Sequence, residues 1–364
     1  MGFSCGIVGL PNVGKSTLFN ALTCAGIAAE NYPFCTIEPN TGVVPVPDER
    51  LEWLSNCFQT QKEIPTTIEF VDIAGLVRGA SQGEGLGNQF LGHVRTTDAI
   101  AHVVRCFDEE NVIHVDDNID PIRDISTIET ELLLKDYESV EKKIESCKKK
   151  IKTNDKDVLF EIELTERLLK HIGEGKLAKL FERNLEEDKF IKTYFLLTDK
   201  PVMYIANTDE NGLNNGNKYI DAVKKLADER GFAVVPVCAK IESEIAELDS
   251  NERKDFLESL GLKESGLNGI IRKGYDLLGL ITYFTAGVKE CRAWTLRAGS
   301  TAPEAAGVIH SDFQKGFIRA ETQSFDDLKR LGSEQAVKEK GLYRIEGKEY
   351  IVKDGDVLFF RFNV

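Results

Sequence analysis

The chain has 364 residues, of which 42% are hydrophobic and 29% are charged, the balance of a soluble globular protein with two or three domains. Its formal net charge of −14 argues against a protein that coats nucleic acid through its overall field, so we expect no DNA partner and leave room only for a local basic patch. No apolar run reaches the roughly 20 residues of a membrane-spanning helix. The N-terminus also lacks the basic region of a signal peptide, so no membrane association is expected.

The cysteines are scattered, and no two of them have the C-x-x-C spacing of a zinc site. Several lie in apolar strand-like runs, where a cysteine packs as a small core residue. We therefore expect neither a disulfide framework nor a zinc site, and a reducing, cytoplasmic compartment.

Short runs rich in β-branched and apolar residues predict five buried strands, at 5–10, 67–73, 101–107, 202–207 and 234–238. They are almost wholly apolar, as parallel strands covered on both faces are. Helical segments lie between them, so the pattern predicts an open, mostly parallel α/β sheet with right-handed crossovers.

The first predicted strand leads into Gly9-Leu10-Pro11-Asn12-Val13-Gly14-Lys15-Ser16 and then a predicted helix. This is the phosphate-binding pattern G-x-x-x-x-G-K-[ST], in which backbone N–H groups and the helix N-terminus surround phosphate oxygens. We expect Lys15 to reach the β- and γ-phosphates as a catalytic cation, and Ser16 to offer its hydroxyl to Mg²⁺. The predicted phosphate-binding residues are Asn12, Val13, Gly14, Lys15, Ser16 and Thr17.

Two further segments suggest a magnesium and γ-phosphate site. Asp72-Ile73-Ala74-Gly75 ends the second predicted strand, where the carboxylate would hold Mg²⁺ through water and the Gly75 N–H would contact the γ-phosphate. Thr36 is placed to complete the Mg²⁺ shell. A simple turn at 72–75 and an ordinary loop threonine are the alternatives.

A long insertion separates the third and fourth predicted strands. Two apolar stripes, Leu133-Tyr137-Val140-Ile144-Cys147-Ile151 and Val158-Ile162-Thr165-Leu169-Ile172, flank the polar stretch "KTNDKD". They predict an antiparallel helical hairpin. The charge run "EKKIESCKKKIK" is interpreted as its solvated face, with a contact to RNA or a protein partner as the alternative.

The fourth predicted strand runs into Asn207-Thr208-Asp209-Glu210. Guanine-binding proteins have Asn-Lys-x-Asp here, and that aspartate reads the base. Glu210 is one methylene longer, and Asp209 comes one residue too early. Because a hydrogen-bonding site discriminates strongly, losing the aspartate should abolish the preference for GTP.

Asn207 and the backbone near Thr208 are then expected to contact adenine instead. Cys238-Ala239-Lys240, after the fifth predicted strand, parallels the Ser-Ala-Lys turn that supports a nucleotide base. A loop that never touches the base is the alternative.

The residue that orients the attacking water in Ras-like enzymes is a glutamine directly after D-x-x-G. Leu76 occupies this position and cannot hydrogen-bond, so slow intrinsic hydrolysis is expected. His114 is the leading candidate to position water, because histidine titrates near neutral pH; a structural role is the alternative. His93, in a predicted helix, and His102, in a predicted buried strand, are weaker candidates.

The C-terminal part changes to strand patterns at "ITYFTA", "ECRAWTLRAG", "GFIRAET" and "YIVKDGDVLFFRF", with a predicted helix near 302–310. This arrangement is similar to a small ubiquitin-like β-grasp module.

In this order, the motifs "GLPNVGKS", "NYPFCTIEPN", "DIAGLVRGAS" and "NTDE" resemble a TRAFAC-class GTPase domain of the Obg group, and more closely the YchF family of Obg-like ATPases. The resemblance covers essentially the whole length. It implies ATP bound with Mg²⁺ in a GTPase-like fold, a C-terminal module called TGS, and the ribosome or ribosomal RNA as partner through the hairpin and that module. The lysines of 142–152, with Lys289, Arg292 and Arg297, are candidate contacts.

The predicted division is therefore a P-loop NTPase (Obg-type G) domain at 1–125 and 199–277, a hairpin at 126–198, and a TGS β-grasp domain at 278–364. Three other functions remain open: a GTP-driven translation or assembly factor, a scaffold whose nucleotide site only stabilises the fold, and a metabolic P-loop kinase. The kinase is disfavoured because no second-substrate lid follows the P-loop.

Overall fold

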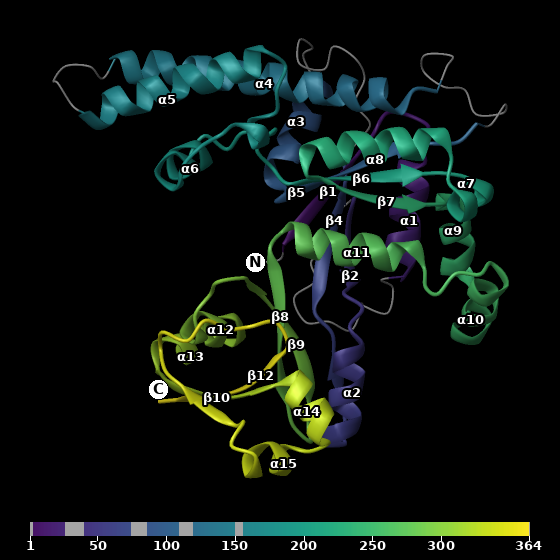
Figure 1. Cartoon of the computed structure of the whole chain (residues 1–364), viewed down its shortest axis with the longest axis vertical. Helices are drawn as coiled ribbons and strands as arrows, with labels where there is room; N and C mark the ends of the chain where they lie inside the picture. The colour runs from purple at the N-terminus through teal and green to yellow at the C-terminus, as the bar shows by residue number, and fades with distance from the viewer. Residues whose placement is uncertain (1–2, 26–39, 74–85, 109–118, 150–155, 364) are drawn as a thin grey trace. The chain divides into compact units, whose positions relative to one another are not determined.

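The computed structural model describes residues 3–25, 40–73, 86–108, 119–149 and 156–363. The chain forms two compact units (Figure 1). The first contains residues 3–42 and 69–270, and the second contains residues 43–68 and 271–364. No helix among the described residues combines the length and the apolar character needed to cross a membrane.

The first unit is built on a sheet with strand order β2-β4-β1-β5-β6-β7. Its strands are β1 (Ser4–Val8), β2 (Thr41–Pro45), β4 (Thr67–Asp72), β5 (Ala99–Arg105), β6 (Val202–Asn207) and β7 (Ala233–Val237). Its helices are α1 (Lys15–Ala25), α3 (Leu86–Thr96), α4 (Pro121–Lys149), α5 (Lys156–Gly173), α6 (Leu185–Lys192), α7 (Glu210–Asn215), α8 (Lys218–Arg230), α9 (Ala239–Glu247), α10 (Ser250–Ser259) and α11 (Gly266–Leu277), with a short 3₁₀ helix at Ala178–Leu180.

All five predicted strands are confirmed as β1, β4, β5, β6 and β7. They pair in parallel, from β4 through β1, β5 and β6 to β7, and every residue of β5 is buried. A central parallel strand has a layer on each face, which explains its continuous apolar run. These five strands therefore bring their carboxyl ends to one edge of the sheet, where α/β proteins bind ligands.

Neighbouring residues of β5 face the two layers. Val104 packs with Ile125 of α4 and Val223 of α8, whereas Val103 faces Gly9 and the phosphate-binding loop. Helices α1 and α9 pack against each other. The alternation follows from the period of two in a strand.

The predicted hairpin is confirmed as α4 and α5, which lie side by side (Figure 1). Val140, Leu164 and Leu168 lie in its buried cluster. One predicted core position is wrong: Tyr137 is 36% exposed. Its neighbour Asp136 is buried instead, because its carboxylate accepts hydrogen bonds from the backbone N–H groups of Leu197 and Thr198 and from the Thr198 hydroxyl.

The predicted solvated face of the hairpin is confirmed for residues 141–149, the part of the charge run that the structure describes. Lys142, Lys148 and Lys149 are exposed. Lys148 pairs with Glu166 at 2.8 Å and the half-buried Lys143 with Glu161 at 2.9 Å. Acidic residues of α5 thus neutralise part of the basic run.

The second unit has a sheet with strand order β11-β10-β12-β8-β9-β3. Its strands are β3 (Glu63–Ile64), β8 (Leu280–Ala286), β9 (Cys291–Arg297), β10 (Phe317–Ser324), β11 (Arg344–Glu346) and β12 (Asp356–Phe362), and its helices are α2 (Glu49–Phe58), α12 (Ala302–Ile309), α13 (Ser311–Lys315), α14 (Phe325–Leu331) and α15 (Glu334–Glu339). A β8–β9 hairpin, a helix, and the terminal strand β12 paired in parallel with β8 form the predicted β-grasp arrangement.

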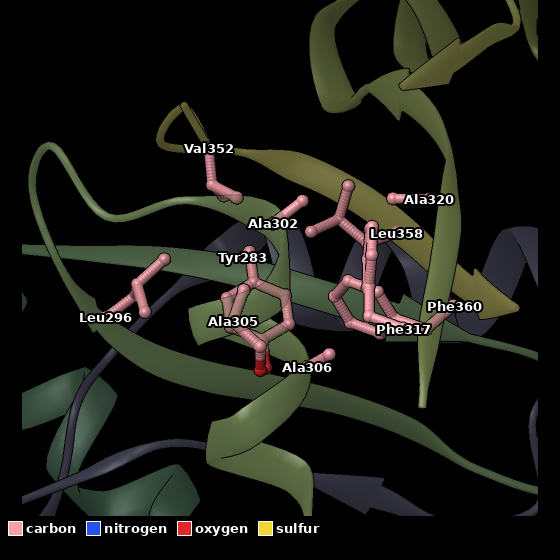
Figure 2. Packing of buried hydrophobic residues seen from close by; sticks show 10 residues of the cluster. All are labelled: Tyr283, Leu296, Ala302, Ala305, Ala306, Phe317, Ala320, Val352, Leu358 and Phe360. Atoms are coloured by element: carbon pink, nitrogen blue, oxygen red, sulfur yellow. The ribbon is translucent and has the colours of Figure 1, made fainter. Parts of the chain in front are cut away.

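The core of this unit surrounds Tyr283 (Figure 2). Ala302, Ala305 and Ala306 of α12 are fully buried, and their small side chains let the helix approach the sheet closely. The Tyr283 hydroxyl donates to the Ala305 carbonyl oxygen at 2.8 Å, so the one polar atom of this ring is satisfied.

Residues 43–68 differ from the predicted division. We expected them in the NTPase domain, but they belong to the second compact unit. Strand β3 pairs with β9, and Leu51 and Leu54 of α2 share a buried cluster with Phe284 and Phe325. The rest of the predicted division remains a prediction.

Arg50 of α2 holds this inserted segment in the second unit. Its guanidinium pairs with Asp48 at 2.7 Å and Asp354 at 2.6 Å and lies 5.2 Å from the centre of the Phe284 ring. Asp354 also accepts from the Thr282 backbone N–H at 2.8 Å. No pattern in the sequence indicates this long-range attachment.

Candidate nucleotide-binding site

The phosphate-binding loop joins β1 to α1. Asn12 and Gly14 have positive φ angles of 63° and 88°, conformations that L-residues with bulky side chains avoid. An added Cβ at Gly9 would lie 2.9 Å from the Val103 carbonyl oxygen, so glycine is needed there for close approach to β5. These backbone turns put the loop directly before the N-terminus of α1, the arrangement that binds phosphate.

Lys15 and Asp72 form an ion pair at this loop. Lys15 is the first residue of α1 and is 9% exposed, and Asp72 is the last residue of β4. The carboxyl end of β4 thus lies beside the phosphate-binding loop, as the sequence predicted. Ser16 and Thr17 follow in the first turn of α1 and are exposed.

The donor set fits a magnesium ion. Ser16 offers a hydroxyl and Asp72 a carboxylate, which are the hard oxygen ligands that Mg²⁺ prefers. Among the described residues no group of three or more His, Cys, Asp or Glu side chains gathers at one place. A cation here would take most of its ligands from phosphate and water, as Mg²⁺ does in nucleotide sites.

Asn207 connects the phosphate-binding loop to the two loops that follow β6 and β7. Its side-chain amide donates to the Val13 carbonyl oxygen at 2.8 Å and accepts from the Ala239 N–H at 2.9 Å. The residue is 4% exposed. One N–H of the amide is thereby committed to the protein, and one remains for a base. Asn207 therefore has a structural role at this junction, and its predicted contact with adenine stays a prediction.

Thr208 differs more from the expectation. It is 2% exposed, its hydroxyl donates to the Cys106 carbonyl oxygen at 3.2 Å, and its backbone N–H donates to the Val237 carbonyl oxygen at 2.8 Å. That N–H is therefore hydrogen-bonded within the protein and is not available to a base. A lysine at 208, as in guanine-binding proteins, would have to leave this buried position.

Asp209 and Glu210 take different roles. Asp209 is the N-cap of α7, and its carboxylate accepts from the Gly212 N–H at 2.7 Å. This cap agrees with the expectation that the Asp209 carboxylate points away from the position that reads the base. Glu210 begins α7 and is exposed.

The second loop expected at the base contains Cys238, Ala239 and Lys240. Cys238 and Ala239 are buried, and Lys240 is exposed in the first turn of α9. Burial raises the pKa of the Cys238 thiol, so this cysteine is a packing residue.

Several predicted residues lie outside the described part of the chain: Thr36, Gly75, Leu76 and His114. Of the weaker histidine candidates, His93 is exposed on α3. His102 is 3% exposed, and burial with the nearby Arg230 charge lowers its pKa to about 3. His102 is therefore a neutral core residue, as expected for a strand position.

Sequence reasoning missed Asn217. It caps α8, and its amide also reaches Thr208 and Cys106. An asparagine directly before a helix signals a cap, but no sequence pattern indicates its second set of partners.

Comparison with known proteins gives consistent results over the whole chain. A family model described as "50S ribosome-binding GTPase" matches residues 4–160, and YchF-GTPase_C, described as "Protein of unknown function (DUF933)", matches residues 280–363. The "Ribosome-binding ATPase YchF" of Haemophilus influenzae is 58% identical over 364 residues and covers 100% of both chains. The protein of the same name from Bacillus subtilis is 53% identical over 366 residues with the same coverage.

A solved structure has the same fold. The Schizosaccharomyces pombe YchF GTPase matches with a TM-score of 0.90 and 40% identity, covering 99% of this chain and 98% of that chain. The P-loop unit, the hairpin and the C-terminal sheet are therefore shared along the full length. This chain belongs to the YchF family of P-loop nucleotide-binding proteins.

Proposed function

We propose that this chain is a Mg²⁺-dependent ATP hydrolase that prefers ATP to GTP, turns over slowly alone, and acts on the ribosome. The observation that carries the base preference is the loop after β6. Asp209 is committed to capping α7, which leaves the longer Glu210 as the exposed carboxylate. A site without the short reading aspartate loses the paired contact to guanine N1–H and the exocyclic amine.

The proposed reaction is attack of water on the γ-phosphorus, with cleavage of its bond to the bridging oxygen, to give ADP and phosphate. Lys15 would stabilise negative charge on the β- and γ-phosphates. Ser16, Asp72 through water, and Thr36 would hold Mg²⁺, which when bound neutralises phosphate charge. The Gly75 N–H is proposed to contact the γ-phosphate.

Calorimetric titration with ATP and with GTP in Mg²⁺ tests the base preference. Tighter ATP binding is expected, and equal or tighter GTP binding would contradict the proposal. Lys15→Ala should abolish hydrolysis because the described residues place no second cation at this loop, and near-normal turnover in that variant would contradict the assignment of Lys15. Lys176→Ala is a matched control, because Lys176 is exposed and its ammonium pairs with the neighbouring Glu174 at 2.8 Å.

His114 remains the proposed water-positioning residue, since Leu76 stands where a glutamine would act. His114→Ala should lower kcat on the order of 10–100-fold with little change in ATP affinity, because the lost interaction forms in the transition state. Single-turnover hydrolysis is the measurement. A parental rate would assign water positioning to the backbone, a bound ion or a partner.

The ribosome is proposed as partner because full-length relatives in Haemophilus influenzae and Bacillus subtilis are named ribosome-binding ATPases. Such a partner implies a cytoplasmic location. We propose ribosomal RNA contacts through the hairpin and the C-terminal unit, which would act as a TGS domain. Candidate RNA contacts are Lys142 and Lys149 on α4 and Arg292, which lies 3.9 Å from the centre of the Trp294 ring. Measuring ATP turnover with and without ribosomes separates a switch protein from a scaffold. The turnover rate of a switch should change on the ribosome, whereas the rate of a scaffold would not.

A GTP-driven factor is the second candidate, because the Schizosaccharomyces pombe relative is described as a GTPase. The same titration decides between them, since a GTP-driven factor must bind GTP at least as tightly as ATP.

A further inference from the structure

Asn217 lies between α7 and α8 and makes two sets of hydrogen bonds. Its side-chain oxygen accepts from the backbone N–H groups of Tyr219 and Ile220 at 3.0 and 2.9 Å. Its side-chain nitrogen donates to the Cys106 carbonyl oxygen at 2.8 Å and the Thr208 hydroxyl at 3.0 Å. An asparagine amide has two donor hydrogens and two acceptor lone pairs, so all four are used and the orientation of the amide is fixed.

The Thr208 hydroxyl is consequently enclosed on several sides. It accepts from Asn217 and donates to Cys106 at the end of β5. An added Cβ on Gly212 of α7 would lie 2.1 Å from the hydroxyl oxygen, so α7 approaches Thr208 so closely that only glycine fits there. The hydroxyl thus joins the end of β5, the start of α8 and the first turns of α7.

The packing of Asn217, Cys106 and Gly212 around the Thr208 hydroxyl determines which atoms of the 207–210 loop can contact a base. With its side chain turned inward, Thr208 leaves the face of the base without the stem that a lysine would supply. Glu210 begins α7, so the packing of α7 on Thr208 sets where the Glu210 carboxylate lies. Asn207, one residue earlier, ties the same loop to the phosphate-binding loop.

We propose that Asn217 is a positioning residue for base selection: its bridge to Thr208 and Cys106 holds the 207–210 loop in the arrangement that admits adenine and gives guanine no paired carboxylate. This inference rests on the proposed preference for ATP and adds the residue that maintains it. Because the amide of Asn217 is fully used within the protein, Asn217 acts through the loop and not by a contact of its own with the base.

Two substitutions separate the bridge from the helix cap. Asn217→Ser keeps a side-chain acceptor for the α8 N-terminus but removes the amide nitrogen that donates to Thr208 and Cys106, whereas Asn217→Ala removes both the acceptor and the amide nitrogen. Asn215→Ser is the matched control, because Asn215 is exposed and its amide donates to Asn211, at 2.8 Å, on the same helix.

The experiment is calorimetric titration of the full-length protein and these variants with ATP, GTP and inorganic triphosphate in Mg²⁺. Triphosphate reports the phosphate site without a base. In Asn217→Ser the ratio of ATP to GTP affinity should fall by about threefold to tenfold, the effect of one or two hydrogen bonds. Triphosphate affinity should stay at the parental value, and Asn215→Ser should match the parent with all three ligands.

The outcomes distinguish this inference from the proposed function. If the parent prefers ATP and Asn217→Ser keeps the parental ratio, the positioning role is overturned and the proposed function stands. If the parent does not prefer ATP, the proposed function fails. The positioning role is then supported if Asn217→Ser loses affinity for both nucleotides but not for triphosphate, and overturned if it binds all three normally.

Thr208→Val keeps the test decisive if Asn217→Ser does not fold. Valine has nearly the shape of threonine and removes only the hydroxyl that receives the bridge. The same fall in the ATP to GTP ratio is expected, and a parental ratio in a folded Thr208→Val protein would overturn the inference.

Discussion

Gly14 lies in the phosphate-binding loop, directly against the side chain of Asn207. Its φ is +88°, and an added Cβ would lie 2.2 Å from the Asn207 side-chain nitrogen. Gly14→Ala therefore costs backbone strain of about 1–2 kcal/mol and displaces a residue that ties two loops together. We expect nucleotide affinity to fall at least about tenfold, measured by calorimetric titration with ATP.

Gly92 on α3 provides the control for Gly14. An added Cβ there meets no atom within 4 Å, and its φ is not in the positive range. Gly92→Ala should leave ATP affinity unchanged and raise the free energy of unfolding by about 0.5–1 kcal/mol, because alanine favours the helix. Parental ATP affinity in Gly14→Ala would show that the loop can relax around a methyl group.

We expect His102 to make the first unit sensitive to acid. Its folded pKa of about 3 lies below the ordinary value of 6.5, so the unfolded chain binds more protons between these values. The stability that the neutral ring contributes is present above pH 6.5 and is lost as pH falls toward 3. The free energy of unfolding should drop by about 2–3 kcal/mol between pH 7 and pH 4.5.

Urea unfolding followed by circular dichroism at both pH values measures this drop. His102→Gln should remove most of it, since glutamine has no proton to gain. His93→Gln, on an exposed helical position, should retain it. A pH dependence unaffected by His102→Gln would assign acid sensitivity to other groups.

At the scale of elements, α2 is the helix that attaches residues 43–68 to the C-terminal sheet. Leu54 is fully buried in the cluster with Phe284 and Phe325. Leu54→Ala should lower the free energy of unfolding of the second unit by about 2–5 kcal/mol, through lost burial and the cavity left behind. Both tryptophans, Trp53 and Trp294, belong to this unit, so tryptophan fluorescence during urea unfolding reports it directly.

Val288→Ala is the control for α2, because Val288 belongs to the same unit and is 64% exposed. Its truncation should change stability by less than about 0.5 kcal/mol. Equal midpoints for Leu54→Ala and the parent would mean that α2 contributes little to the unit with which it packs.

At the scale of the whole molecule, the chain passes between the compact units inside regular elements. The boundaries fall at 42/43, 68/69 and 270/271, within β2, β4 and α11. Strand β4 begins with residues of the second unit and ends with Asp72 of the phosphate site. We therefore expect the two units to unfold together, because an element shared by both cannot melt in only one.

Ligand addition tests this cooperativity. ATP with Mg²⁺ at about 100 times its Kd should stabilise the cooperative unit that contains the P-loop by about 2.7 kcal/mol. Since both tryptophans lie in the other unit, a shift of the fluorescence midpoint would report joint unfolding. An unshifted fluorescence midpoint beside a shifted circular dichroism midpoint would mean that the units unfold independently.

The sequence by itself determined the features that depend on local pattern. Continuous apolar runs identified all five predicted parallel strands, heptad-like stripes identified the α4–α5 hairpin, and the spacing of Gly9, Gly14, Lys15 and Ser16 identified the phosphate-binding loop. These signals succeed because strand burial, helix amphipathicity and a phosphate-binding turn are each encoded by neighbouring residues.

Only the tertiary structure decided the contacts between distant parts of the chain. Segment 43–68 lies between two motifs of the nucleotide domain, yet Arg50 pairs with Asp354, 304 residues away. Asp136, not Tyr137, is buried because backbone N–H groups of Leu197 and Thr198 satisfy its carboxylate. Thr208 is turned inward because Asn217, Cys106 and Gly212 enclose its hydroxyl. Such partners are chosen by hydrogen-bond satisfaction and close packing in three dimensions, which no local pattern in the sequence records.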